Sequence, residues 1–183
     1  MPEHVLAERG PVLRSALSRC VGVPTEQFAD EFWGRTALLS PANDDFTDLF
    51  SPAAVDELVG RRALRTPFVR LAHEGDVLAP ARYTSSGGYG AEVSDQVSSD
   101  KVLAEFAAGA TIVLQGLHRM WPPLVDFTRE LVEELGHPAQ VNAYVTPPSS
   151  QGSPRTTTPT TCSSCRCPAR SAGSSTHPYT RTR

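Results

Sequence analysis

Lysine and long apolar runs are scarce in this chain of 183 residues. Lys101 is the single lysine, and the other 16 basic residues are arginines. No apolar run approaches the ~20 residues that cross a bilayer. The opening Met-Pro-Glu-His also lacks the charged and apolar regions of a signal peptide. We therefore expect a cytoplasmic protein that makes no membrane contact.

Acidic and large apolar residues are missing from the last 31 residues. Residues 1–152 carry all 20 acids and 12 bases, a net charge of −8, whereas residues 153–183 carry five arginines and no acid. The net negative charge of residues 1–152 offers no basic surface for nucleic acid, so we expect no direct nucleic-acid binding. The end segment contains no Leu, Ile, Val, Met, Phe or Trp. It cannot bury enough surface to offset its ordering entropy, and we expect a disordered tail over 153–183.

Residues 1–152 have the pattern of one folded α+β domain, with helices first and then strands alternating with helices. The expected helices begin at a capping residue or proline and end near a glycine, and they cover 11–20, a segment from Thr25, 51–59, 100–109 and 122–135. The expected strands are short apolar or alternating runs, at 37–39, 68–71, 111–114 and 141–146.

Several candidate chemical groups have simpler structural explanations. The glycine-rich run from Tyr83 to Gly90 lacks the further signature of a phosphate loop, so a flexible loop is favoured. His73 near Gly75 suggests a solvated turn, and His118 has no partner in sight and is interpreted as structural. Cys20 lies on an apolar helical face and is interpreted as a small buried hydrophobe.

The most informative stretch runs from Gln140 to Gly152, Gln-Val-Asn-Ala-Tyr-Val-Thr-Pro-Pro-Ser-Ser-Gln-Gly. Its alternating half predicts a strand with one apolar and one polar face, and the two prolines stop it. Together with Val-Leu-Gln-Gly at 113–116 and Trp-Pro-Pro at 121–123, this run resembles the cupin-like JmjC oxygenases of the ribosomal-oxygenase type. The resemblance covers roughly residues 25–152.

This resemblance implies the first part of a double-stranded β-helix and an iron(II)- and 2-oxoglutarate-dependent protein hydroxylase. Asn142 and Tyr144 would line the co-substrate pocket, with the Tyr144 hydroxyl offered to a carboxylate. The resemblance implies a protein substrate, with ribosomal protein as the family suggestion, and a homodimer for the intact family member. A lysine that pairs with the far carboxylate lies beyond the metal motif in the family, but no lysine follows Lys101 here.

The family's iron ligands, His-x-Asp followed much later by a second His, are missing from this chain. Where they should begin, residues 156–161 are Thr-Thr-Thr-Pro-Thr-Thr, and threonine hydroxyls cannot replace imidazole and carboxylate. Threonine codons are ACN, so stepping back one nucleotide allows these six residues to be reread as His-Tyr-Asp-Thr-His-Asp. We interpret residues 153–183 as a probable frameshift product and assign no catalytic or metal-binding residue.

The leading hypothesis is therefore a truncated oxygenase that binds neither iron nor 2-oxoglutarate productively and is catalytically inactive. The alternative is a small non-enzymatic binding module whose Thr/Arg/Cys-rich tail contacts a partner. A zinc site at Cys162, Cys165, Cys167 and His177 is a distant third. A fragment would also leave open strand edges near 111–115 and 141–146 and be marginally stable.

Overall fold

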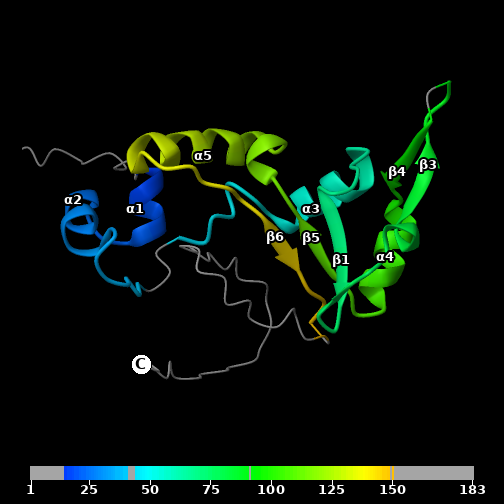
Figure 1. Ribbon diagram of the computed structural model, residues 1–183, viewed down its shortest axis with the longest axis horizontal. Coiled ribbons are helices and arrows are strands. Elements are labelled where there is room, and N and C mark those ends of the chain that lie inside the picture. Colours follow the sequence, from blue (N-terminus) through cyan, green and yellow to red (C-terminus); the bar gives the residue numbers. More distant parts are fainter. Residues whose placement is uncertain (1–14, 41–43, 91, 149, 151–183) are drawn as a thin grey trace, which may run out of the picture.

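The computed structural model describes residues 15–40, 44–90, 92–148 and 150, and it confirms a mixed α+β fold with antiparallel sheets (Figure 1). The expected tail, 153–183, lies outside the described residues, as do its cysteines and His177. The α-helices are α1 (Ala16–Val21), α2 (Thr25–Gln27), α3 (Pro52–Arg61), α4 (Ser99–Ala107) and α5 (Pro122–Leu135). Shorter helical turns are η1 (Phe28–Phe32), η2 (Pro80–Arg82) and η3 (Leu117–Arg119).

Within the described residues, six strands form two sheets. The strands are β1 (Val69–His73), β2 (Asp76–Val77), β3 (Thr84–Gly87), β4 (Val93–Val97), β5 (Thr111–Leu114) and β6 (Ala143–Val145). The larger sheet has the order β2-β1-β5-β6 with antiparallel neighbours throughout, and β3 and β4 form a separate antiparallel pair. Figure 1 shows this pair projecting at one end of the molecule, with α1 and α2 at the other.

Helix boundaries follow local chemistry. Ser51 caps α3 by accepting a hydrogen bond from the Ala54 amide, and Pro52 occupies the first position. Two prolines open α5, and Gly136 ends it with a left-handed φ of 62°. No helix in the described residues is long and apolar enough to cross a membrane.

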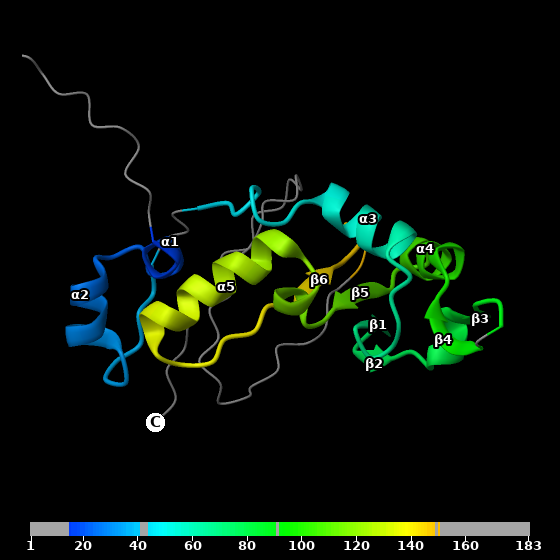
Figure 2. The same ribbon diagram turned by 90° about the horizontal axis from the view of Figure 1, so that it is seen from above.

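The core lies on one face of the larger sheet. Its fully buried strand residues include Val69 and Leu71 of β1 and Leu114 of β5. They pack in one cluster with Leu58 of α3 and Val102 of α4. Figure 2 shows α3 alongside the strands, which is where this cluster forms. Because successive side chains of a strand point to opposite faces, the residues between these core positions lie on the other face of the sheet.

Helices α1 and α5 are joined by polar contacts. The backbone amides of Ala16 and Leu17 donate to the carboxylates of Glu130 and Glu134 on α5, at 3.1 and 2.7 Å. Acceptors at a helix N-terminus satisfy amides that have no partner within the helix.

Arg19 of α1 connects this helix pair to the segment before α3. Its guanidinium donates to Asp44 at 2.6 Å and to Asp48 at 2.7 Å. It also lies over the rings of Phe46 and Phe127, 5.0 and 5.5 Å from their centroids. We call these five residues the Arg19 clamp.

Some sequence expectations were wrong. Residues 37–39 form no strand, and Leu39 is 96% exposed, because this apolar run finds no neighbouring strand. The expected loop from Tyr83 to Gly90 is partly strand, since β3 pairs with β4, a strand that the sequence did not predict.

Two expected helix caps also lie inside their helices. Thr25 is the first residue of α2, after Pro24, and Asp100 lies in the first turn of α4, after Ser98. The strand expected at 141–146 is shorter in the structure, since pairing with β5 covers only Ala143–Val145.

Candidate site on the polar face of the sheet

The face of the larger sheet opposite the core carries a set of mostly polar side chains. Register pairs Arg70 with Val113 and Val113 with Tyr144, so these three form one row across β1, β5 and β6. Alternation extends this row to a patch that we call the polar sheet face, comprising Phe68, Arg70, Ala72, Thr111, Val113, Gln115, Asn142, Tyr144 and Thr146.

Asn142 is held by the backbone of the turn after β5. Its Oδ1 accepts a hydrogen bond of 3.0 Å from the Gly116 amide. Gly116 adopts a left-handed φ of 68°, and a Cβ there would lie 3.4 Å from the Phe68 ring. One function of Asn142 is therefore to fasten the turn between β5 and η3, a role that the sequence did not reveal.

Tyr144 lies in the middle of β6 with its side chain 63% exposed. Its neighbours Ala143 and Val145 pack against the core cluster, so the expected alternation of this strand is confirmed. The Thr111 and Thr146 hydroxyls share a hydrogen bond of 3.0 Å across β5 and β6. Tyr144 therefore lies on a strand that is held to β5 by backbone pairing and by this side-chain hydrogen bond.

Arg70 is the charged member of the polar sheet face. Its Nε is buried and has no hydrogen-bond partner within the described chain. None of the ion pairs found among the described residues includes it. Burial raises the pKa of the Tyr83 hydroxyl, and the positive charge of Arg70 partly opposes that rise. A buried donor without a partner is costly and needs an explanation.

Iron donors do not gather in the described part of the chain. No group of three or more His, Cys, Asp or Glu side chains is placed to hold a metal ion there. His118 Nδ1 accepts a hydrogen bond of 3.1 Å from the Val141 amide, which supports its structural interpretation. His73 ends β1 beside the turn at Glu74 and Gly75, as expected, and its Nε2 packs near Gly109. These donors do not fit an iron site.

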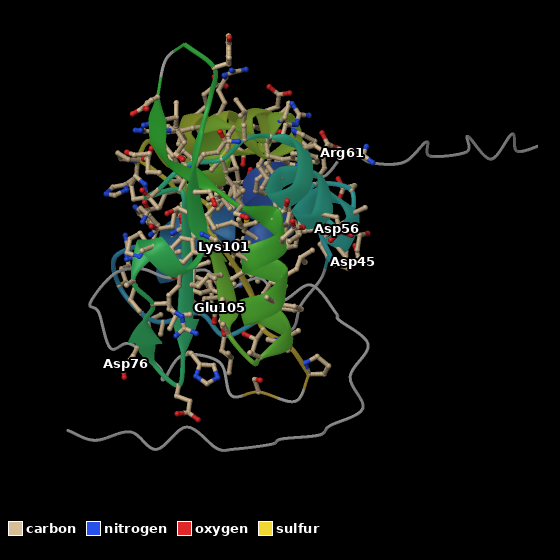
Figure 3. The ribbon with its side chains drawn as sticks, turned by 90° about the vertical axis from the view of Figure 1, so that its right-hand side faces the viewer. Asp45, Asp56, Arg61, Asp76, Lys101 and Glu105 are labelled. Atoms are coloured by element: carbon tan, nitrogen blue, oxygen red, sulfur yellow. The ribbon has the colours of Figure 1, made fainter. Side chains whose placement is uncertain are left out.

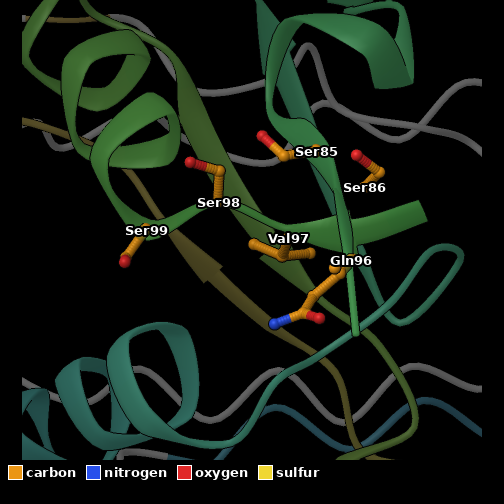
Figure 4. Close-up of a pocket in the computed structure, with 7 residues that line it drawn as sticks. Ser85, Ser86, Gln96, Val97, Ser98 and Ser99 are labelled. Carbon is orange, nitrogen blue, oxygen red and sulfur yellow. The ribbon is translucent and has the colours of Figure 1, made fainter. Parts of the chain in front are cut away.

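A recess lies between the β3–β4 pair and the start of α4 (Figure 4). Its lining is mainly serine, with Ser85 and Ser86 from β3 and Ser98 and Ser99 from the start of α4. Gly87 gives room to Gln96, whose Oε1 would lie 2.1 Å from an added Cβ. The recess is polar but contains no charged side chain.

Charges of both signs are interspersed on the surface around α3 and α4 (Figure 3). Glu105 of α4 pairs with Arg82 at 2.8 Å, while Lys101 donates to the Thr84 carbonyl at 2.6 Å. Asp95 pairs with Arg65, and the hydrogen bond from Arg65 lowers the pKa of that carboxyl. Arg65, Arg82 and Lys101 therefore each have an oxygen partner on this side of the described chain.

Comparison with known proteins adds no identification. No protein-family model matches the chain, and no curated protein matches it.

In the structure, Asn142 and Tyr144, the two residues expected at the site, share the polar sheet face with Arg70. Alternation in Phe68-Val69-Arg70-Leu71 could have pointed to Arg70, because it places the arginine opposite the core side. What the sequence lacked was the register of β1 against β5 and β6, which is a tertiary property.

Proposed function

We propose that residues 1–152 are the N-terminal part of an iron(II)- and 2-oxoglutarate-dependent protein hydroxylase, and that the chain with its present tail is inactive. The observation that carries the proposal is the run from Asn142 to Gly152, which would precede the metal ligands in such an enzyme. The run includes β6, which lies at one end of the strand order in the larger sheet.

The form of the sheet supports this proposal. An antiparallel sheet with one apolar and one polar face is the building unit of a double-stranded β-helix, whose interior holds the ligand. Asn142 and Tyr144 belong to the polar sheet face, together with an arginine that lacks a partner. Further strands beyond β6 would continue the sheet and enclose this face.

The residues present do not supply the iron site that the proposal implies. In such an enzyme iron and 2-oxoglutarate together activate dioxygen, and the protein binds and orients them. Asn142 and Tyr144 would contact the co-substrate, but the described chain gathers no set of iron ligands. We therefore derive no catalytic step for this chain.

The decisive experiment reads and then restores the coding frame. Sequencing the DNA between Gly152 and the stop codon should reveal an open frame that encodes His-Tyr-Asp and a long β-rich continuation. The restored protein should bind one iron per chain and decarboxylate 2-oxoglutarate, while the present chain should do neither. Absence of such a frame, or stoichiometric iron with turnover in the present chain, would refute the proposal.

A binding module is the second candidate, and the edge strand β6 is the observation that favours it. An exposed edge can accept an extended peptide as an additional strand, with Tyr144 available for side-chain contacts. This function predicts that intact relatives share the present ending, and that amide exchange in β6 slows when a partner peptide binds. A parent frame with the iron motif would rule it out.

A further inference from the structure

We propose that the recess between the β3–β4 pair and the start of α4 binds a small neutral polyol, the size of a simple sugar (Figure 4). Its polar side chains, which we call the recess set, are Ser85, Ser86, Gln96, Ser98 and Ser99. The recess lies at the end of the molecule where β3 and β4 project, so this inference does not depend on the function proposed for the larger sheet.

Three members of the recess set share one face of the hairpin. Register pairs Ser85 with Gln96, so their side chains lie side by side on the same face. The Ser98 backbone is still extended, with φ −93° and ψ 114°, and its amide donates to the Tyr83 carbonyl at 2.9 Å. Strand alternation therefore continues to Ser98 and places its side chain on that face too.

The polar groups of the recess set have no hydrogen-bond partner within the described chain. Ser15 and Ser51 use their hydroxyls to cap α1 and α3, whereas Ser98, in the same position before α4, makes no capping bond. A hydroxyl donates once and can accept twice, and a side-chain amide both donates and accepts. The recess set therefore offers donors and acceptors together, which matches the hydroxyl groups of a polyol.

Gly87 gives the Gln96 amide its place at the recess. A Cβ at Gly87 would collide with the Gln96 Oε1, so glycine leaves the room that this side chain occupies. Gly87 is not among the glycines with a left-handed φ, so its backbone conformation is also open to alanine. Gly87→Ala should therefore displace the end of the Gln96 side chain without straining the backbone.

The surroundings favour a neutral ligand over an anion. No charged side chain lines the recess. The amides of the first turn of α4 could attract an anion, but Asp100 adds a negative charge to that turn. Lys101 is engaged by the Thr84 carbonyl, to which its Nζ donates at 2.6 Å. An anion would therefore find no side-chain cation among the residues that line the recess.

The size of the recess limits the ligand. Its volume is about 250 Å³, which is the space that about eight water molecules occupy in the liquid. Pockets for drug-sized ligands have about 300–1,000 Å³ and a mostly apolar lining. This recess is smaller and polar, so we expect it to take a simple sugar rather than a larger apolar molecule.

The test uses the full 183-residue chain. Glucose and ribose are titrated, with inorganic phosphate as the anionic comparison, and binding is followed by calorimetry and by amide chemical shifts. We expect saturable binding of at least one of the two sugars with a dissociation constant of about 1–10 mM, and phosphate binding about tenfold weaker or less. The largest shifts should fall at Ser85, Gln96 and Ser98.

Matched variants assign the residues. Gly87→Ala displaces the Gln96 amide, and Ser98→Ala removes a hydroxyl that makes no capping bond, so both variants should fold normally. Each should weaken sugar binding by about three- to tenfold, as expected for the loss of one hydrogen bond. Ser94→Ala is the control and should keep full affinity, since Ser94 is exposed on the same strand but does not line the recess.

Clear results would overturn the inference. No saturable binding of either sugar, or tighter binding of phosphate than of the sugars, would reject the polyol site. Full affinity in both Gly87→Ala and Ser98→Ala would place the ligand elsewhere. An equal loss in Ser94→Ala and Ser98→Ala would show that binding does not depend on the recess. None of these results bears on the fragment proposal, which the coding frame decides.

Discussion

Asn142 should be needed for stability even when no co-substrate is present. Its Oδ1 holds the Gly116 amide at 3.0 Å, at the turn that connects β5 to η3. Asn142→Ala removes this hydrogen bond and leaves the amide with no side-chain acceptor. Loss of one partner from a buried pair costs about 1–3 kcal/mol, and this pair is part-buried, so we expect a loss of about 2 kcal/mol in the free energy of unfolding.

Two measurements check this expectation. Urea unfolding should show a lower midpoint with an unchanged slope, and a loss of about 2 kcal/mol corresponds to a fall in Tm of about 4–8 °C. Hydrogen exchange at the Gly116 amide should accelerate, a readout that works even where the unfolding transition is broad.

Tyr144→Phe is the control, because the exposed hydroxyl of Tyr144 has no hydrogen bond within the described chain. Its free energy of unfolding should stay within about 0.5 kcal/mol of wild type. Asn142→Asp keeps an acceptor and should lose less stability than Asn142→Ala. If Asn142→Ala and Tyr144→Phe were equally stable and Gly116 exchange did not change, the fastening role of Asn142 would be wrong.

Three further predictions concern the clamp and the sheet edge. Arg19→Met should lose about 2–3 kcal/mol in urea unfolding because both ion pairs and the ring contacts disappear, whereas Asp48→Asn, at a 60% exposed position, should cost under about 1 kcal/mol. The hydrogen bond from Arg19 lowers the pKa of Asp48, so its stabilisation is complete above the unfolded pKa of about 3.9 and is lost as pH falls through the lower folded value. A Tm titration from about pH 5 to 2 should show this loss, and Asp48→Asn should flatten it. The β6 edge predicts light scattering that rises with protein concentration and falls in Tyr144→Lys; a monodisperse wild type would contradict it.

Local signals predicted the helices better than the strands. Prolines at the start and Gly136 at the end define α5 within its own sequence, so its expected bounds agree with the structure. The β3–β4 pair is different, because Ser85, Ser86 and Gly87 have low strand propensity. Their conformation comes from pairing with β4, a contact that no single segment encodes.

For the candidate site too, local periodicity predicted some features and long-range contacts determined the others. Alternation along β6 predicted that Tyr144 points away from the core, and the register confirms it. The hydrogen bond from Gly116 to Asn142 and the unpaired Nε of Arg70 depend on residues 26 or more positions away in sequence. Periodicity cannot show such contacts, since it reports only which face a side chain occupies.

The state of the polar sheet face helps to distinguish a ligand-binding interior from an ordinary solvent-facing surface. Antiparallel sheets commonly expose one polar face to water, and there an arginine keeps all its donors hydrated. Here Thr111 and Val113 of β5 are only 3% and 5% exposed, and the Nε of Arg70, on the neighbouring strand β1, is buried without an acceptor. Tyr144, on the same row, remains open at 63%. The polar sheet face is thus closed at β5 and open at Tyr144 of β6, which differs from a sheet face that is exposed to water throughout.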